Sequence, residues 1–398
     1  MNIYVTGMGM VSAIGQNTAE TFDHLQAERT GIGPIRHVPT RLQEGYVAGE
    51  IDRSDEALRE LVGHTGPQPL TRTTALACLA VREALQQADL TELDPAIRTG
   101  LVSSSTVGGV VRTERYYQQF LAGEDVPDIV RTHNESESTE YISRWLGIRH
   151  FVSTLNTACA SSSNAVVLGA RLIRQGMLDR VIVGGADALC RFTLNGFNSL
   201  LLLDPELCRP FDENRKGINL GEGAAYLILE SERLVNRRSA RPIARLSGFG
   251  ATNDAYHQTS TSPEAIGLQT AMRQALQRSG LTPDAIGYIN AHGTGTPNND
   301  ATEGVALREV FAGNVPAFSS TKSFTGHTLA AAGSMGAVLS LLAMQKGVVL
   351  PNLNYRQPIA DHGLEPVTSF QTVRPYHHVM ANSMGMGGVC ASLIFSDN

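Results

Sequence analysis

The chain has 398 residues, of which 42% are hydrophobic and 18% are charged, so it is long enough to bury a large core. Its formal net charge of −6 excludes a general electrostatic attraction to nucleic acid or to an anionic membrane surface. The five cysteines are odd in number and widely spaced, which fits neither a disulfide framework nor a CxxC metal site; they are Cys78, Cys159, Cys190, Cys208 and Cys390. We therefore expect a cytoplasmic protein with no signal peptide and no membrane span, because the longest apolar run, 336–344, is too short to cross a bilayer.

The first part of the chain predicts alternating strands and helices with glycine-rich connections. A strand that starts at Ile3 leads to Gly7-x-Gly9, which with Gly15 resembles a dinucleotide-binding fingerprint only loosely, because the spacing is wrong and no acidic residue follows a second strand. The segment 30–66 is predicted to be irregular. Helices are predicted over 18–28, with Asn17 as N-cap, over 71–88 and over 112–121, and a strand is predicted over 99–105.

The stretch around Cys159 is predicted to be the point where a strand becomes a helix. The β-rich run 150–155 precedes it, and a helical run of small residues, 160–174, follows it. A helix N-terminus offers unpaired N–H groups and the positive end of the helix dipole, and both favour the thiolate, which is the nucleophilic form of cysteine. Cys159 is therefore a candidate nucleophile. The alternative is that it is a small buried hydrophobic residue, which is the usual fate of a free cysteine.

A change in composition at 237–242 divides the chain into two predicted halves, 1–240 and 241–398. Before this change, the strands 180–185 and 224–230 are predicted; the continuous apolar run in the first of them predicts a covered, mostly parallel sheet. After it, strands are predicted over 243–247, 286–291, 318–320 and 391–395, and helices over 266–279, 301–311 and 334–346. Both halves are thus predicted to be α/β.

The two halves resemble each other in sequence. Segment 221–228 matches segment 387–394, since both begin with glycines and continue as an apolar strand. At the same offset, the Cys159 elbow and its helix match 325–327 and the helix 330–337. One offset that serves two segments indicates an internal duplication, which would place Cys159 near a pseudo-twofold axis.

Two histidine motifs favour the interpretation of Cys159 as a nucleophile over the alternative of a buried structural residue. His292 opens the motif HGTGTP at a strand end, and Lys322 precedes His327 in the motif KSFTGH. Glycines allow a ligand to approach the backbone closely, and threonine hydroxyls can bind a polar substrate arm. A metal site is weakly indicated, because the two histidines lie far apart in sequence and no HExxH-like pair is present.

With these motifs the chain resembles the elongating, decarboxylating beta-ketoacyl-acyl-carrier-protein synthases. The matching motifs span the chain in the family's order: TACAS around Cys159, RPFD at 209–212, GEG at 221–223, HGTGTP at 292–297, STKSFTGH at 320–327 and NSMGMGG at 382–388. The resemblance implies the thiolase fold, with two duplicated α/β halves in five layers, αβαβα, usually as a homodimer. It also implies decarboxylative condensation of an acyl thioester with malonyl-acyl carrier protein to give a 3-oxoacyl-acyl carrier protein, as in fatty acid elongation.

The resemblance implies roles for four residues at the reacting atoms. Cys159 would take the acyl chain as a thioester, and the backbone N–H groups of Cys159 and Met386 would form the oxyanion hole. His292 and His327 would promote decarboxylation of the malonyl thioester. Two neutral imidazole N–H donors suit this step, because loss of CO2 leaves an enolate oxygen that they can stabilise.

Further roles follow from the same resemblance. Lys322 would order the site and pair with Glu303. Thr294 and Thr296 would hold the phosphopantetheine arm of the acyl carrier protein, the expected partner. No metal and no cofactor other than that carried arm is implied.

Some positions depart from the family pattern and bear on the substrate. Met384 and Met386 stand in the C-terminal glycine loop where the family has phenylalanines, and the resemblance implies that Met386 would be the gate between acyl pocket and active site. Segment 133–137 is more polar than in housekeeping elongation enzymes, and 200–203 is apolar where the family often has a basic carrier-contact residue. A ketosynthase of a specialised polyene or polyketide pathway is therefore an alternative to fatty acid elongation.

Three other classes of protein fit the sequence less well. A non-catalytic chain-length partner would lack the nucleophile, whereas Cys159 and both histidines are present. A thiolase would need a second catalytic cysteine just ahead of the final glycine loop, but Cys390 follows that loop. A priming synthase would use Cys-His-Asn, whereas this chain has the Lys322 motif.

Overall fold

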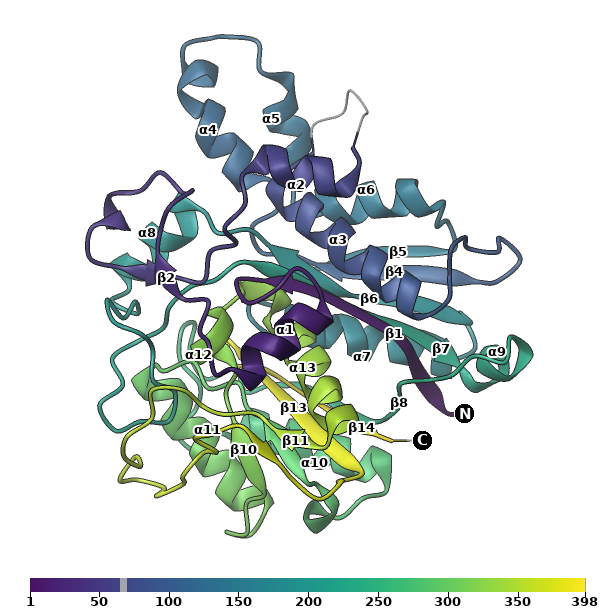
Figure 1. The fold of residues 1–398 in the computed structure, drawn as a ribbon, viewed down its shortest axis with the longest axis vertical. Coiled ribbons are helices and arrows are strands. Elements are labelled where there is room, and N and C mark those ends of the chain that lie inside the picture. The colour runs from purple at the N-terminus through teal and green to yellow at the C-terminus, as the bar shows by residue number, and fades with distance from the viewer. Residues whose placement is uncertain (65–69, 398) are drawn as a thin grey trace.

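The structure is a computed structural model that describes residues 1–64 and 70–397. Ten of its strands join in the order β10-β9-β13-β14-β8-β1-β7-β6-β4-β5 (Figure 1). The strands of the first half are β1 (Ile3–Ser12), β4 (Thr99–Ser104), β5 (Phe151–Leu155), β6 (Arg180–Asp187) and β7 (Gly223–Ser231). Those of the second half are β8 (Ala244–Asn253), β9 (Tyr288–Asn290), β10 (Ala317–Ser319), β13 (His378–Gly385) and β14 (Val389–Ser396).

The two halves repeat one strand order, as the predicted duplication requires. From the centre outward, the first half runs β1-β7-β6-β4-β5 and the second runs β8-β14-β13-β9-β10. The halves join where Tyr4 and Val5 of β1 pair with Arg245 and Ala244 of β8. Strands β7 and β14, whose sequences match, hold equivalent places. The division between residues 240 and 241 falls in the connection from α9 (Glu232–Arg237) to β8 and stays a prediction.

The sheet is mixed, so the prediction of a mostly parallel sheet is wrong. Strand β4 pairs in parallel with β5 and β6, and β9 pairs in parallel with β10 and β13. The pairs β1–β7, β1–β8, β6–β7, β8–β14 and β13–β14 are antiparallel. The apolar run in β6 indicates that both faces of that strand are covered. Burial on both faces does not determine whether the neighbouring strands are parallel or antiparallel.

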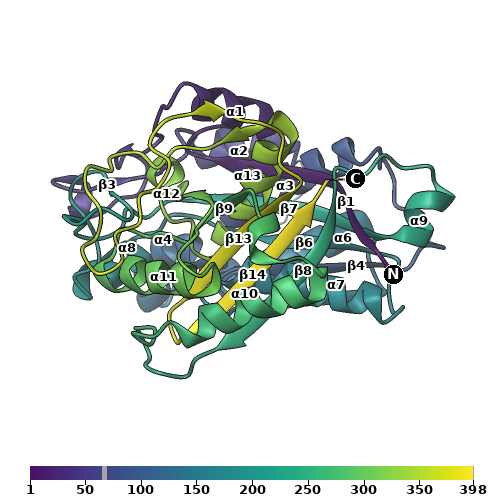
Figure 2. The same cartoon turned by 90° about the horizontal axis from the view of Figure 1, so that it is seen from below.

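The helices complete the layers of the thiolase fold. α3 (Arg72–Gln87) packs on β1 and β7, and α10 (Ile266–Ser279) packs on β8 and β14, where Figure 2 shows it lying along these strands. α7 (Ser161–Arg174) and α13 (Ala332–Lys346) pack on each other and on strands of both halves. The five layers are therefore outer helices, sheet, central helices, sheet and outer helices.

The helical run 329–346 corrects one expectation about membranes. Its 18 residues have a mean hydropathy of 1.2, so by length and composition it could span a bilayer, and the prediction that no run is long enough is wrong. However, 83% of the run is buried inside the protein, as expected for a helix of the central layer. In the ranges 1–64 and 70–397, no second helix meets these criteria.

Shorter elements complete the described chain. The remaining helices are α1 (Thr18–Gln26), α2 (Asp55–Val62), α4 (Val110–Leu121), α5 (Pro127–Thr132), α6 (Glu137–Leu146), α8 (Arg191–Ser199), α11 (Pro297–Val310) and α12 (Lys322–Thr325). Two-stranded pairs are β2 (Gly33–Pro34) with β3 (Val47–Ala48), and β11 (Val348–Val349) with β12 (Gln371–Thr372).

Local capping explains where two of these helices begin. The predicted cap of α1 is confirmed, because the Asn17 side chain accepts the Glu20 N–H at 2.8 Å. The segment 30–66, predicted to be irregular, contains α2, whose N-cap Ser54 accepts the Ala57 N–H at 3.2 Å. Positions 65 and 66 of that segment lie outside the described residues.

Candidate active site

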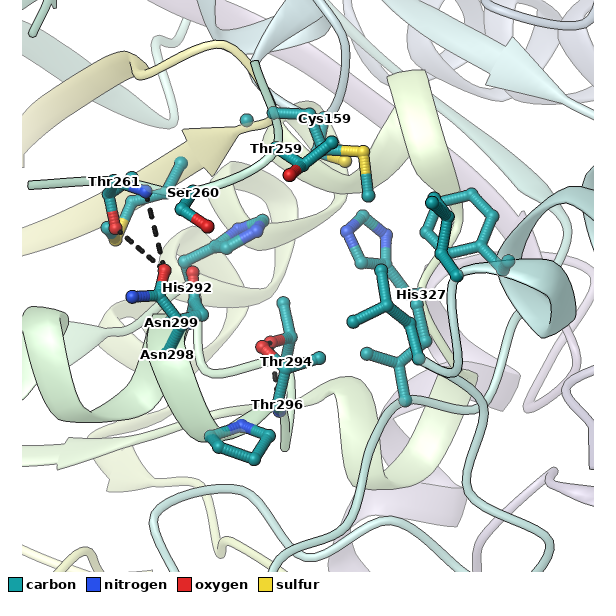
Figure 3. Close-up of a pocket in the computed structure, with 18 of the residues that line it drawn as sticks. Cys159, Thr259, Ser260, Thr261, His292, Thr294, Thr296, Asn298, Asn299 and His327 are labelled. Carbon is teal, nitrogen blue, oxygen red and sulfur yellow. Dashed lines mark hydrogen bonds between the residues drawn. The ribbon is translucent and has the colours of Figure 1, made fainter. Parts of the chain in front are cut away.

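Six of the eight predicted site residues meet at one cavity of about 370 Å³, whereas Lys322 and Glu303 do not line it. Cys159 lies just before α7, His292 follows β9, His327 follows α12, and Met386 lies in the turn between β13 and β14. Figure 3 shows the Cys159 side chain and the two imidazole rings facing the same space. Both halves of the chain therefore supply the cavity, as the predicted pseudo-axis suggested.

The Cys159 elbow is held by local hydrogen bonds. Ala158 has φ 51°, a left-handed conformation that costs free energy in a non-glycine residue. The Ser161 hydroxyl accepts the Thr157 N–H at 2.8 Å and donates to the Ala158 carbonyl at 2.5 Å. Gly385 packs so closely that a Cβ there would lie 3.2 Å from the Cys159 nitrogen. This strained turn places the cysteine at the cavity wall instead of inside the helix.

The electrostatic surroundings keep the Cys159 thiol protonated at neutral pH. Burial raises the pKa of the thiol to about 11, although the Lys322 ammonium and two backbone N–H groups lower it. The N–H at the helix start favours the thiolate, as predicted, but burial raises the pKa by more, so the free protein holds the thiol form. The two N–H groups beside the sulfur belong to Cys159 and Met386, the pair expected as the oxyanion hole. This position allows them to donate to an oxygen that develops next to the sulfur.

The histidine rings are neutral and carry their protons on Nε2. Burial lowers the pKa of both imidazoles well below the usual value, and the nearby Lys322 charge adds to this effect. Nδ1 of His327 accepts the Leu329 N–H at 3.1 Å, and Nδ1 of His292 lies 3.3 Å from the Lys322 ammonium. With both Nδ1 atoms used as acceptors, each Nε2–H is a donor. The ring centroids lie 5.3 Å apart at 82°, and both rings line the cavity that contains Cys159.

Lys322 and Glu303 both bind the backbone at His292. The Lys322 ammonium donates to the His292 carbonyl oxygen, and the Glu303 carboxylate accepts the N–H groups of His292 at 2.8 Å and Gly293 at 2.7 Å. In the part of the chain that the structure describes, no salt bridge joins the two side chains, and their predicted pairing takes the form of an electrostatic interaction between the two buried charges. Burial lowers the pKa of Lys322 and raises that of Glu303, and each charge opposes the shift of the other.

Thr294 and Thr296 line the cavity, with their hydroxyls 2.9 Å apart. Their loop is anchored by Asp300, whose buried carboxylate accepts the N–H groups of Thr294 at 2.9 Å and Phe211 at 2.7 Å. Phe211 has φ 61° and lies against Gly293, where a Cβ would come within 2.6 Å of its ring. Sequence reasoning assigned no role to Asp300; its anchoring role depends on how the RPFD segment folds against this loop.

Asp187 is a buried carboxylate that sequence reasoning missed. It lies at the end of β6 and accepts the Ser105 hydroxyl at 2.6 Å and the N–H groups of Val107 at 3.0 Å and Ala330 at 2.8 Å. The last contact fixes the turn at Leu329, which has φ 50° and whose N–H binds His327. The only sequence signal was an acidic residue directly after an apolar strand. Asp187 thus links the first half to the position of His327.

The cavity has one further wall, which no sequence motif predicted. Thr259, Ser260 and Thr261 line it from the loop after β8, as Figure 3 shows. The Thr261 N–H and hydroxyl both lie 3.3 Å from the Asn298 side-chain oxygen, which ties this loop to the start of α11. No group of three His, Cys, Asp or Glu residues in the described ranges could hold a metal ion.

Comparisons with known proteins agree with this geometry. The family model for the beta-ketoacyl synthase N-terminal domain matches residues 1–234, and that for the C-terminal domain matches residues 243–356. Nodulation protein E of Rhizobium meliloti (strain 1021) is 32% identical, with 99% of this chain and 98% of the relative covered. The 3-oxoacyl-[acyl-carrier-protein] synthase 2 of Staphylococcus aureus (strain N315) is 31% identical, with 99% and 97% covered.

A solved structure gives the same result. The ishigamide ketosynthase/chain length factor superposes with a TM-score of 0.93 at 32% identity, over 100% of this chain and 99% of that one. The matching domains, the relatives and the fold together show that the chain belongs to the beta-ketoacyl synthase family of the thiolase superfamily.

Proposed function

We propose that the chain joins an acyl group held on Cys159 to a malonyl group held on an acyl carrier protein. Membership of the beta-ketoacyl synthase family supports the condensation reaction, and the assignment of steps to residues is our proposal. The observation that carries it is the meeting, at one cavity, of a buried thiol, two amide N–H groups beside it and two Nε2–H donors. Few other reactions need all of these groups together.

The first step is acyl transfer to the protein. The Cys159 sulfur attacks the thioester carbonyl of the acyl carrier, forming a new C–S bond. The carbonyl oxygen gains negative charge, which the N–H groups of Cys159 and Met386 stabilise. The carrier's C–S bond then breaks, and the carrier thiol leaves with the proton that the cysteine gave up. The two histidines are donors in this arrangement, so they do not act as the base.

The second step is decarboxylative condensation. The malonyl carrier loses CO2, and the electron pair of the broken C–C bond forms an enolate whose oxygen receives the Nε2–H groups of His292 and His327. The enolate carbon attacks the Cys159 thioester and expels the thiolate, which takes a proton from solvent. Thr294 and Thr296 would bind the phosphopantetheine arm that brings the malonyl group into the cavity. Each turnover yields a 3-oxoacyl carrier, free carrier thiol and CO2.

We propose further that the acyl chain belongs to a specialised polyene or polyketide pathway. Met384 and Met386 line the cavity beside Cys159, and methionine adapts to stiff or irregular ligands because it is unbranched and flexible. Segment 133–137 borders a second cavity of about 560 Å³ that mixes polar and apolar side chains, including Glu114 and Tyr117. The similarity to the ishigamide ketosynthase/chain length factor supports the same choice.

Fatty acid elongation is the second candidate. It is favoured by the 31% identity, over nearly the whole chain, to the 3-oxoacyl-[acyl-carrier-protein] synthase 2 of Staphylococcus aureus. The two candidates share the chemistry at Cys159 and differ in the acyl chain that the pocket accepts.

A second thiolase-fold subunit is part of the proposal. Strand β5 lies at the edge of the sheet, and its Val152 is 40% exposed. An open edge of this kind is a template for pairing with another chain. The predicted homodimer would use it with a second copy, and a heterodimer would use it with a chain-length partner.

The experiment supplies malonyl carrier protein and a panel of acyl carriers, saturated and conjugated, and determines the products by mass spectrometry. We expect Cys159 to carry the acyl group and the product to be a 3-oxoacyl carrier extended by one malonyl-derived unit. Preference for conjugated chains would support the specialised pathway, and preference for saturated chains would support fatty acid elongation. An acyl label on Cys78, Cys190, Cys208 or Cys390 would contradict the assignment.

A further inference from the structure

A cavity of about 520 Å³ lies at the end of β6 that is far from the reacting groups. Its charged lining residues are Arg98, Asp179, Arg233 and Arg237, and we call it the arginine cavity. Asp179 directly precedes β6, whose last residue, Asp187, binds the turn that positions His327. The 8 residues of β6 span roughly 25 Å, and Figure 1 and Figure 2 both place α9 on the opposite side of the molecule from α12. The arginine cavity is therefore separate from the site at Cys159.

Backbone hydrogen bonds hold the segments around the arginine cavity together. The Asp179 N–H donates to the Arg98 carbonyl at 2.9 Å, and the Ser231 N–H donates to the Asp179 carbonyl at 3.0 Å. Ser231 is the N-cap of α9, and Arg233 and Arg237 lie four residues apart on this helix, which places them on one face. The three arginines therefore gather on a framework that is fixed by strand pairing.

The Asp179 carboxylate orients two of the guanidinium groups. It accepts hydrogen bonds from Nε of Arg98 at 2.9 Å, from Nη2 of Arg98 at 3.1 Å and from Nη2 of Arg233. Nη1 of Arg98 also donates to the Gly176 carbonyl at 2.7 Å. The hydrogen bonds from Arg98, and then those from Arg233, lower the pKa of Asp179 to about 2, so the carboxylate is ionised at neutral pH. A guanidinium that is already held in place loses less conformational entropy when it binds a ligand.

Positive charge exceeds negative charge in the arginine cavity. Three arginines and one aspartate line it, which leaves two positive charges without a carboxylate. The nearby Asp94 carboxylate accepts the Ala96 N–H at 2.8 Å instead. Glu232 accepts the Asn2 side-chain amide at 2.9 Å. Within residues 1–64 and 70–397, the Arg237 guanidinium has no hydrogen-bond or ion-pair partner. Like charges that gather in this way repel one another, so the cavity favours an anion.

We propose that the arginine cavity binds a dianionic phosphate group, either free or attached to a small organic molecule. Guanidinium groups bind phosphate oxygens through pairs of parallel hydrogen bonds, and two negative charges match the excess charge of the lining. The side chains of Ala96, Ile97 and Leu234 add an apolar wall that suits the organic part of such a molecule. The site is separate from the condensation chemistry, so the proposal does not rest on the proposed function.

Calorimetric titration of the full chain with sodium phosphate tests the site. At pH 8 a phosphate group is mostly dianionic, and sodium chloride keeps the ionic strength constant. Arg237→Gln removes an exposed guanidinium, and its melting temperature in chloride alone checks the fold. Arg29→Gln is the matched control, because Arg29 is an exposed arginine that follows α1.

We expect the Kd for phosphate to rise about tenfold in Arg237→Gln, the scale of one charge-assisted hydrogen bond, and to keep its wild-type value in Arg29→Gln. The wild-type Kd should also rise with ionic strength. Equal binding of phosphate by the wild type and Arg237→Gln would overturn the proposal. A second measurement needs no variant: phosphate should slow the labelling of Arg233 and Arg237 by phenylglyoxal and leave that of Arg29 unchanged. Labelling of all three at the same rate with and without phosphate would also overturn it.

Two further probes, ADP and adenosine, identify the source of the phosphate group. They share an organic part and differ in the phosphate groups. Tighter binding of ADP than of inorganic phosphate would support an organic phosphate as the ligand, and equal binding would support free phosphate. Adenosine that binds as tightly as ADP would show that the phosphate is not the group recognised, which contradicts the proposal.

Discussion

The Lys322 ammonium contacts His292 twice, at its carbonyl oxygen and at 3.3 Å from its Nδ1. One cation therefore fixes both the backbone of the histidine and the nitrogen that carries its proton. Because an ammonium can only donate, Nδ1 must accept, and Nε2 must carry the hydrogen that faces a developing enolate. The assignment of Lys322 as an ordering residue thus has a specific meaning: it sets the tautomer of His292.

Lys322→Met should weaken decarboxylation, because the His292 proton can then move to Nδ1 and the Nε2 donor is lost part of the time. The loss should be smaller than the ~100- to 1,000-fold typical of removing such a donor completely. Without the Lys322 charge the pKa of His292 rises, and the imidazolium formed as pH falls has N–H groups on both nitrogens. The rate of CO2 release by Lys322→Met, divided by the wild-type rate, should therefore rise as pH falls. A ratio that stays constant or falls on acidification would contradict the tautomer assignment. Lys346→Met is the control.

Cys159 should react slowly with iodoacetamide at neutral pH. Its pKa is raised to about 11, mainly by burial, so the reactive thiolate forms only as pH rises toward that value. The alkylation rate, followed by peptide mapping, should still increase well above pH 8.5, the typical pKa of a free cysteine. A plateau near that typical value would show that the helix start and Lys322 outweigh burial.

Asp187→Asn tests two effects of the Asp187 carboxylate: its hydrogen bonds to the turn that positions His327, and its negative charge near Cys159. An amide offers one acceptor and one donor, so one side of residue 187 would face the Ala330 or Val107 N–H with a donor of its own. If the turn that positions His327 loosens, decarboxylation should fall about tenfold, the scale of one charge-assisted hydrogen bond. Removing the negative charge should also lower the pKa of Cys159 and speed its alkylation at a given pH.

Asp212→Asn is the matched control for that variant. Asp212 is a buried carboxylate that accepts the Arg356 N–H at 2.6 Å and the Gln357 N–H at 3.0 Å, on a different loop. It should lower the melting temperature without the opposite changes in the two rates. The same pattern in both variants would reduce the role of Asp187 to general stability.

Met386→Phe should change substrate preference more than overall rate. Met386 lies in a loop with Gly385, Gly387 and Gly388, and its N–H is one of the two beside the Cys159 sulfur. A rigid ring in place of a flexible chain should slow acceptance of long conjugated acyl groups while short saturated ones pass. Elongation of both acyl carriers by wild type and variant tests this. An equal effect on the two substrates, or none, leaves the gate without support.

The sequence was most informative where chemistry requires particular residue types. The Cys159 elbow, the two histidines and the paired threonines were all identified before the structure, and they meet at one cavity. Their environment was less predictable. The thiol pKa depends on how many atoms surround the sulfur, and the contact of Lys322 with His292 depends on a fold that brings together residues 30 positions apart.

The fold likewise has features that the sequence predicted and features that it did not. The duplication was visible because segments 221–228 and 387–394 both begin with glycines and continue as the apolar strands β7 and β14. The antiparallel pairing of β6 with β7 was not visible, because the pattern of buried residues does not depend on strand direction. Asp187 and Asp300 were missed as anchors because each also accepts a backbone N–H from far away in the sequence, that of Ala330 for Asp187 and of Phe211 for Asp300, and a backbone partner leaves no signature in side-chain identity.

The central claim is that two neutral imidazoles donate to one enolate oxygen, and CO2 release from malonyl carrier protein tests it most directly. Release should be measured for wild type, His292→Ala, His327→Ala and the double variant, with melting temperatures as a check on folding. Each single variant should lose ~100- to 1,000-fold in rate, and the double variant should lose far less than the product of the two, because the donors act as a unit. Near-normal release from either single variant would contradict the account.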